Sequence, residues 1–195
     1  MKAASKPTEI PEERDAPRFA LLIRTAKLVG ATGEYLCVVR DISASGVRLQ
    51  LFHPVPSSSL KLELSSGVTY AVVKVWEEGE NAGFRFVDHV DVRAFMQEPS
   101  RHARRPIRLR LRVPVQLHTQ GGTRLATLQD LSRYGARVRS TRPFEIDERL
   151  ELELPGLPPI PATIAWRSGL SCGLTLRRGF TFEDLAQLAV KLQPI

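Results

Sequence analysis

The sequence predicts an all-β protein made of two tandem six-stranded antiparallel barrels, each followed by a short C-terminal helix. Two observations lead to this fold class. A set of five features recurs in the same order about 90 residues further along the chain. Within each copy, short runs with an apolar residue at every second position alternate with turns rich in Gly, Pro and Ser. Closing such a sheet into a barrel removes its exposed edges.

The repeat covers nearly the whole chain. Arg14 and Arg18 recur as Arg104 and Arg108, and the Asp41–Gly46 segment recurs as Asp130–Gly135. Further matches are Leu60–Leu64 with Leu150–Leu154, Trp76 with Trp166, and Gly83–Phe86 with Gly173–Leu176. A period near 90 is the size of a small domain and too long for a solenoid unit. We therefore expect a tail at 1–9, a first domain at 10–97 and a second domain at 98–195.

The strands follow from the alternation of apolar and polar residues. The first copy has candidates beginning at Phe19 and at Tyr35–Ile42, Gly46–Phe52, Leu60–Leu64, Thr69–Trp76 and Gly83–Val87. The second has them at Leu109–Leu117, Thr123–Leu131, Ala136–Ser140, Leu150–Leu154, Ala162–Trp166 and Gly173–Arg177. Helical spacing is confined to Val90–Gln97 and Thr181–Val190, the second with a capping Thr and acids in its first turn. We expect Trp76, Trp166, Phe84 and Phe86 to belong to the cores.

Charge is distributed unequally between the copies. Residues 1–97 carry 12 Lys/Arg and 12 Asp/Glu, whereas residues 98–195 carry 16 and 9, so the whole net charge of +7 belongs to the second copy. Six arginines and no acid lie between Arg101 and Arg112. An anionic partner is the natural expectation for this segment.

Several function classes lack support. Cys37 and Cys172 are too few for a disulfide framework or a zinc site, and we expect two buried thiols. The histidines lack metal-binding spacing, and no nucleophile, base and orienting residue recur together, so neither a metal cofactor nor catalysis is expected. No run reaches the roughly 18 apolar residues of a membrane span, and no secretory signal begins the chain, so a cytoplasmic protein is expected.

Each copy combines an arginine pair before its first strand with an Asp-x-Ser-x-x-Gly turn after its second. An arginine fork can grip O6 and N7 of guanine or a phosphate, and Asp can accept from guanine N1 and N2. Ser43 and Ser132 can bond either the turn backbone or a ligand oxygen. Gly46 and Gly135 suit a positive φ or a close ligand approach. The candidate ligand-binding residues are Arg14, Arg18, Asp41, Ser43 and Gly46, with Arg104, Arg108, Asp130, Ser132 and Gly135.

These paired motifs, with a later Trp and a strand similar to Gly-x-x-Phe, resemble the PilZ domain. The resemblance implies a six-stranded barrel with a C-terminal helix that acts as a non-enzymatic receptor for the bacterial messenger cyclic di-GMP. It also implies that the arginines close over the ligand and that binding relays a signal to a protein partner, in motility, biofilm or exopolysaccharide control. We expect the second copy to bind more tightly, because Glu12, Glu13 and Asp15 surround the arginines of the first.

Three alternatives remain open. The arginine pair of the second copy could also be Arg101 with Arg105 or Arg108 with Arg112, although Arg104 and Arg108 preserve the spacing to the Asp turn best. A basic barrel could bind nucleic acid, which is less expected because the basic excess is confined to one copy. A ligand-free interaction scaffold is the third. The protein partner, the oligomeric state and the number of nucleotides per site are not specified by the sequence.

Overall fold

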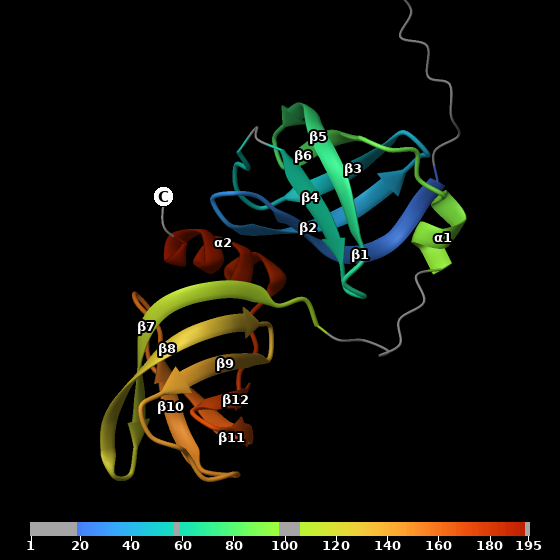
Figure 1. Ribbon diagram of the computed structural model, residues 1–195. Coiled ribbons are helices and arrows are strands. Elements are labelled where there is room, and N and C mark those ends of the chain that lie inside the picture. The colour runs from blue at the N-terminus through green and yellow to red at the C-terminus, as the bar shows by residue number, and fades with distance from the viewer. Residues whose placement is uncertain (1–18, 57–58, 98–105, 194–195) are drawn as a thin grey trace, which may run out of the picture.

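Two closed six-stranded antiparallel barrels, one after the other along the chain, form the protein (Figure 1). The computed structural model describes residues 19–56, 59–97 and 106–193. The predicted all-β class with a short C-terminal helix is confirmed. The two barrels share one strand order, because each closes in the sequence first, second, third, sixth, fifth and fourth strand.

The elements lie where the alternation predicted them. The first barrel comprises β1 (Phe19–Val29), β2 (Glu34–Ile42), β3 (Gly46–Leu51), β4 (Leu60–Leu64), β5 (Thr69–Glu78) and β6 (Asn81–Phe86), followed by α1 (Val92–Gln97). The second comprises β7 (Leu109–Thr119), β8 (Gly122–Ser132), β9 (Gly135–Ser140), β10 (Arg149–Glu153), β11 (Ile160–Ser168) and β12 (Ser171–Leu176), followed by α2 (Phe182–Leu192).

Strand β7 illustrates how the period of two builds a barrel wall. Its apolar residues from Leu109 to Leu117 are buried in the core of the second barrel, whereas Arg110 and Arg112 between them are exposed. Successive side chains of a strand point to opposite faces, so one face fills the barrel and the other carries the arginines. Each barrel has its own hydrophobic core.

Helix α2 lies between the two barrels (Figure 1) and contacts both β2 and β7. Thr181 caps its start, since the Thr181 hydroxyl accepts from the backbone N–H of Asp184 at 3.0 Å. Leu36 of β2 is packed into the core of the second barrel, not the first. Six consecutive residues of β2, Glu34 to Val39, are buried, so both faces of this strand are covered.

The tryptophans are not core residues, which corrects the sequence-based expectation. Phe84 and Phe86 are buried as predicted, but Trp76 and Trp166 are 41% and 40% exposed. Each indole lies on the outer wall over a glycine of the neighbouring strand: a Cβ built on Gly83 or Gly173 would come within 2.0 Å of it. The missing glycine side chain leaves a shallow recess outside the barrel, and the indole fills it instead of entering the core.

Candidate functional site

The two Asp-x-Ser-x-x-Gly segments form tight turns that connect β2 to β3 and β8 to β9. In the first, the Ser43 N–H donates to the Gly46 carbonyl at 2.8 Å, and the Gly46 N–H donates to the Ser43 hydroxyl at 3.1 Å. In the second, the Ser132 hydroxyl donates to the Gly135 carbonyl at 3.0 Å, and Ser132 is 1% exposed. The sequence left two partners open for these serine hydroxyls, the turn backbone or a ligand oxygen. In both turns the hydroxyl forms its hydrogen bond with the turn backbone.

The glycines are required by a close approach between strands. A Cβ on Gly46 would lie 2.9 Å from the Phe84 carbonyl oxygen, and one on Gly135 would lie 2.7 Å from that of Leu174. Neither glycine has a positive φ, so that part of the expectation was wrong. The atom that excludes a side chain belongs to the backbone of the neighbouring strand, β6 or β12.

Asp130 is held between two arginines at the end of β8. Its carboxylate accepts from Arg108 Nη1 at 2.7 Å and lies 3.0 Å from Arg137 Nε, and Asp130 is 7% exposed. The arginine side chains remain nearly half exposed, at 47% for Arg108 and 46% for Arg137. The carboxylate is therefore enclosed while the cations keep donors free for a further acceptor.

The first copy has the same arrangement with one arginine fewer among the described residues. Asp41 accepts from Arg48 Nε at 2.5 Å, and Arg48 corresponds to Arg137. Three of the sequence-predicted arginines, Arg14, Arg18 and Arg104, lie outside the described residues. The structure thus brings together Arg108 and Asp130 of the predicted set, and places Ser132 and Gly135 in the turn beneath them.

Strand pairing aligns these groups with the exposed indole. Arg110 pairs with Asp130, Asp130 with Arg137, Arg137 with Gly173, and Gly173 with Trp166. We call these five residues the outer row, because they cross the outer wall of the second barrel over five adjacent strands. Two guanidinium groups, a carboxylate and an aromatic face along one line suit a ligand with both phosphate and purine groups.

The corresponding row of the first barrel differs at one end. It reads Ala20, Asp41, Arg48, Gly83 and Trp76, so alanine stands where the second barrel has Arg110. Sequence reasoning missed Arg48 and Arg137, although each follows the turn glycine by two residues in both copies. That recurrence extends the repeated motif to Asp-x-Ser-x-x-Gly-x-Arg and could have revealed the arginine.

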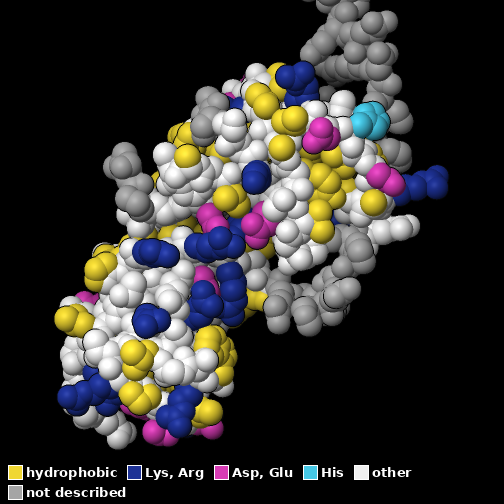
Figure 2. All heavy atoms as spheres, in the orientation of Figure 1, with side chains coloured by type: hydrophobic (Ala, Val, Ile, Leu, Met, Phe, Trp, Pro, Cys, Tyr) yellow, Lys and Arg dark blue, Asp and Glu magenta, His cyan; other side chains and the backbone are white. Residues whose placement is uncertain are grey.

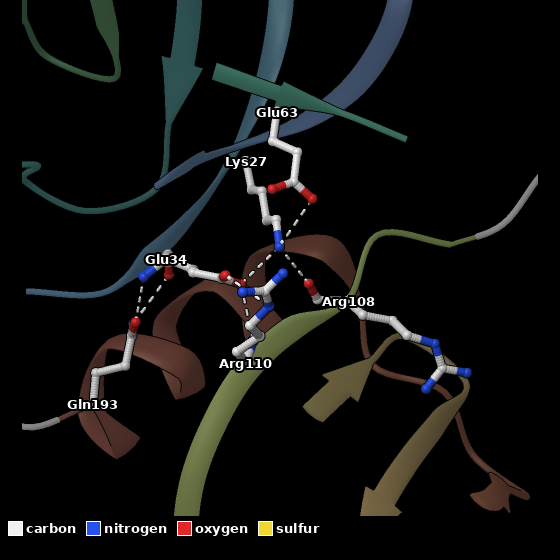
Figure 3. Close-up of polar contacts among 6 residues, drawn as sticks. All are labelled: Lys27, Glu34, Glu63, Arg108, Arg110 and Gln193. Atoms are coloured by element: carbon white, nitrogen blue, oxygen red, sulfur yellow. Dashed lines mark hydrogen bonds and ion pairs between the residues drawn. The ribbon is translucent and has the colours of Figure 1, made fainter. Parts of the chain in front are cut away.

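Residues of the first barrel reach the start of this site (Figure 3). Lys27 Nζ donates to Glu34 Oε2 at 2.8 Å and to the Arg108 carbonyl oxygen at 3.0 Å, and it lies 3.3 Å from Glu63 Oε1. Glu34 Oε2 also accepts from the backbone N–H of Arg110 at 2.9 Å. Lys27 and Glu34 are only 4% and 6% exposed, so a buried ion pair links the two barrels.

Basic side chains gather on the second barrel near its junction with the first (Figure 2). Arg112 on β7 and Arg139 on β9 are exposed beside the outer row. A groove of about 800 Å³ lies elsewhere, between the Pro155–Pro161 segment and α2, and is lined mainly by apolar groups. Its lining contains no residue of the outer row, so the candidate site is an open basic wall and not this groove.

The remaining candidate groups are the two cysteines and possible metal ligands. Both cysteines are free and buried, as expected. Burial raises the pKa of Cys37, and burial with the nearby Glu148 raises the pKa of Cys172 to about 11, so both thiols stay protonated near neutral pH. Among the described residues, no group of His, Cys, Asp and Glu is arranged to hold a metal ion, and no helix is long and apolar enough to cross a bilayer.

Comparison with protein families gives a match within the second copy. Residues 99–191 match the PilZ domain. The matched residues, called the PilZ segment below, contain β7 to β12, nearly all of α2 and the whole outer row. The first barrel shares the strand order of the PilZ segment, and the presence of two copies of this domain stays a prediction. No curated protein matches the chain.

Solved structures with similarity across both barrels include three bacterial proteins. The PlzA protein of Borreliella burgdorferi, in complex with c-di-GMP, has 14% identity and a TM-score of 0.37, with 88% of each chain covered. The Bacillus subtilis inhibitor of motility MotI/DgrA has 13% identity and a TM-score of 0.38, with 88% of this chain and 97% of that chain covered. Escherichia coli YcgR, in complex with c-di-GMP, has 14% identity and a TM-score of 0.33, with 86% and 82% covered.

Proposed function

We propose that the protein is a non-enzymatic receptor for cyclic di-GMP and that the second barrel holds the principal site. The observation that carries this proposal is the outer row together with Arg108. Asp130 of the row forms ion pairs with Arg137 of the row and with Arg108, and the row ends on the exposed Trp166. The location of the row inside the PilZ segment supports the same ligand class.

Residues of the row and residues next to it have defined parts in this proposal. The half-exposed guanidinium groups of Arg108 and Arg137, with Arg104, take phosphate oxygens or the O6 and N7 edge of guanine. Asp130 orients the arginines and offers an acceptor to guanine N1 or N2. Trp166 presents an aromatic face for stacking. Ser132 and Gly135 shape the turn that carries Asp130.

The first barrel is proposed as a weaker second site formed by Arg14, Arg18, Asp41, Ser43 and Gly46. Its row keeps Asp41, Arg48 and Trp76 but has Ala20 in the place of Arg110. One cation fewer lowers the field that attracts an anion. We further propose the division into domains 10–97 and 98–195, and that the ligand-bound form signals by contact with a protein partner in the cytoplasm.

Isothermal titration calorimetry of the whole chain with cyclic di-GMP tests the proposal. The double variant Arg104→Ala/Arg108→Ala should abolish the tight binding event, whereas Arg149→Ala should leave it unchanged. Arg149 is the matched control because it is an exposed arginine on β10, which pairs with neither β8 nor β9. If the unmodified chain gives no heat with cyclic di-GMP at concentrations up to about 100 µM, the binding free energy is less favourable than about −5.5 kcal/mol. The proposed receptor function is then wrong.

One observation favours a second candidate, nucleic-acid binding. Arg112 and Arg139 extend the basic surface beyond the row, which gives this wall more cations than one small anion needs. A polyanion would then bind with a steep dependence on salt concentration. Tight oligonucleotide binding that weakens about 100-fold between 50 and 200 mM salt, without binding of cyclic di-GMP, would favour this candidate over the receptor.

A further inference from the structure

Two backbone groups at the start of β7 form hydrogen bonds with side chains of the first barrel. The Arg108 carbonyl oxygen accepts from Lys27 Nζ at 3.0 Å, and the Arg110 N–H donates to Glu34 Oε2 at 2.9 Å. Leu109, between them, is fully buried in the second barrel. The backbone of residues 108–110 is thereby fixed between the core of one barrel and the polar groups of the other (Figure 3).

The side chains of Lys27 and Glu34, which form these hydrogen bonds, are themselves held in place by several contacts. Lys27 donates to Glu34 and to the Arg108 carbonyl, and it forms an ion pair with Glu63 at 3.3 Å. Ala26 and Leu28 on either side of Lys27 are fully buried, so the Lys27 side chain points to the outer wall of β1, where the second barrel covers it. A buried ammonium and carboxylate are costly to leave without partners, which restricts both barrels to this arrangement.

These hydrogen bonds affect the site because Arg108 is held both at its backbone and at its side chain. Its carbonyl is bound by Lys27, while its guanidinium extends the other way to Asp130, 2.7 Å distant. Arg110, the first residue of the outer row, has its N–H on Glu34 and its guanidinium Nε 3.7 Å from the same carboxylate. The position of both arginines therefore depends on side chains of the first barrel.

We propose that Lys27 and Glu34 are positioning residues for ligand binding in the second barrel. This inference rests on the proposed function, and it assigns part of the site of the second barrel to the first. Neither residue contacts the ligand. They hold the backbone of residues 108–110 where the Arg108 side chain meets Asp130, so the second barrel binds its ligand with full affinity only while these two side-chain contacts are made.

Calorimetry with cyclic di-GMP on full-length Lys27→Met and Glu34→Gln variants tests the proposal. We expect Kd to rise about tenfold for Lys27→Met, which removes the donor to the Arg108 carbonyl. We expect a rise of about fivefold for Glu34→Gln, which removes the negative charge that pairs with Lys27 and leaves a weaker, neutral acceptor for the Arg110 N–H. Glu34→Gln preserves side-chain shape and leaves Lys27 its contact with Glu63. It therefore decides the question if Lys27→Met does not fold, as judged by circular dichroism.

Two controls separate positioning from general effects. Lys61→Met removes an exposed lysine from β4 and should not change Kd. Gln193→Ala removes the bond that Gln193 Nε2 donates to the Glu34 carbonyl at 3.0 Å, which loosens the contact between α2 and β2 without touching β7. Gln193→Ala should change Kd by less than about twofold, a difference below 0.5 kcal/mol at 25 °C.

The outcomes are distinct. Wild-type Kd in both Lys27→Met and Glu34→Gln overturns the positioning role while the receptor function stands. An equal loss of affinity in Gln193→Ala also overturns it, because barrel docking in general would then be responsible. Absence of binding in the unmodified chain refutes the receptor function itself and the positioning role with it.

Discussion

Gly135→Ala should destabilise the second barrel without any involvement of ligand. A Cβ at this position lies 2.7 Å from the Leu174 carbonyl oxygen, about 0.7 Å short of the 3.4 Å at which ordinary contacts begin. The obstructing atom belongs to the backbone of β12, which pairs with β9 through Gly135 and Thr175, so it cannot rotate away. Overpacking of this kind costs about 1–3 kcal/mol.

The net effect is slightly smaller than that cost because alanine also restricts the unfolded chain, which returns about 0.4–1 kcal/mol. We therefore expect a loss of about 1.3 kcal/mol, or a fall in Tm of about 8 °C for a domain of this size. Thermal unfolding by circular dichroism, without nucleotide, measures it. Gly121→Ala is the matched control, since its Cβ would meet only the Thr119 hydroxyl at 3.8 Å and its φ is not positive. A Gly135→Ala variant with unchanged Tm and lost binding would refute this reasoning and place the glycine against the ligand.

Three further predictions follow from the structure. Gly173→Ala should displace Trp166 from the outer wall, because the new Cβ would lie 2.0 Å from the indole Nε1. A red shift of the indole fluorescence would report this displacement. An unchanged spectrum would contradict the presence of a recess at Gly173. Burial raises the pKa of both thiols above their ordinary value of 9.0, and that of Cys172 to about 11. Above pH 9 the unfolded chain therefore binds fewer protons than the folded chain, so the free energy of unfolding should fall as pH rises from 9 to 11. Urea unfolding should show that Cys37→Ala/Cys172→Ala flattens this fall by up to about 1.4 kcal/mol per pH unit for each thiol, and an identical slope in the variant would contradict it. A fragment of residues 98–195 should be less stable than the same barrel in the whole chain, because Leu36 then leaves its core; equal urea midpoints would contradict a shared core.

Alternation in the sequence was sufficient to predict most of the strands, because most of the barrel wall has one buried and one exposed face. Strand β7, with apolar residues inward and arginines outward, is the clearest example. The sequence also suggested the contact between Arg108 and Asp130, since their separation of 22 residues is close to the 23 residues between Arg18 and Asp41 in the first copy. Both features depend on local periodicity or on the repeat, which a single sequence contains.

The outer row and the contacts of Lys27 and Glu34 with the second barrel could not be predicted in the same way. A register shift between Arg110 and Val113 alters the pairing of β7 with β8, so the partner of Asp130 on β7 cannot be counted from the turn between these strands. The pairing of Arg137 with Gly173 joins strands that do not follow one another in the sequence. No spacing connects Lys27 to the Arg108 carbonyl. The run Tyr35–Val39 was nevertheless informative, because five apolar residues without alternation indicate a strand covered on both faces. The tryptophans were misplaced because an aromatic residue was assumed to need the core, whereas a glycine opposite it provides a recess outside.

The matched pair Asp130→Asn and Asp41→Asn, titrated with cyclic di-GMP by calorimetry in the whole chain, tests the proposed receptor most directly. The unmodified chain should show a tight event and a weaker one. Asp130→Asn should weaken the tight event at least about tenfold, because Arg108 and Arg137 lose their shared carboxylate, while Asp41→Asn should alter only the weaker event. Absence of heat in the unmodified chain, or loss of the tight event in Asp41→Asn alone, would contradict a receptor whose principal site is the outer row of the second barrel.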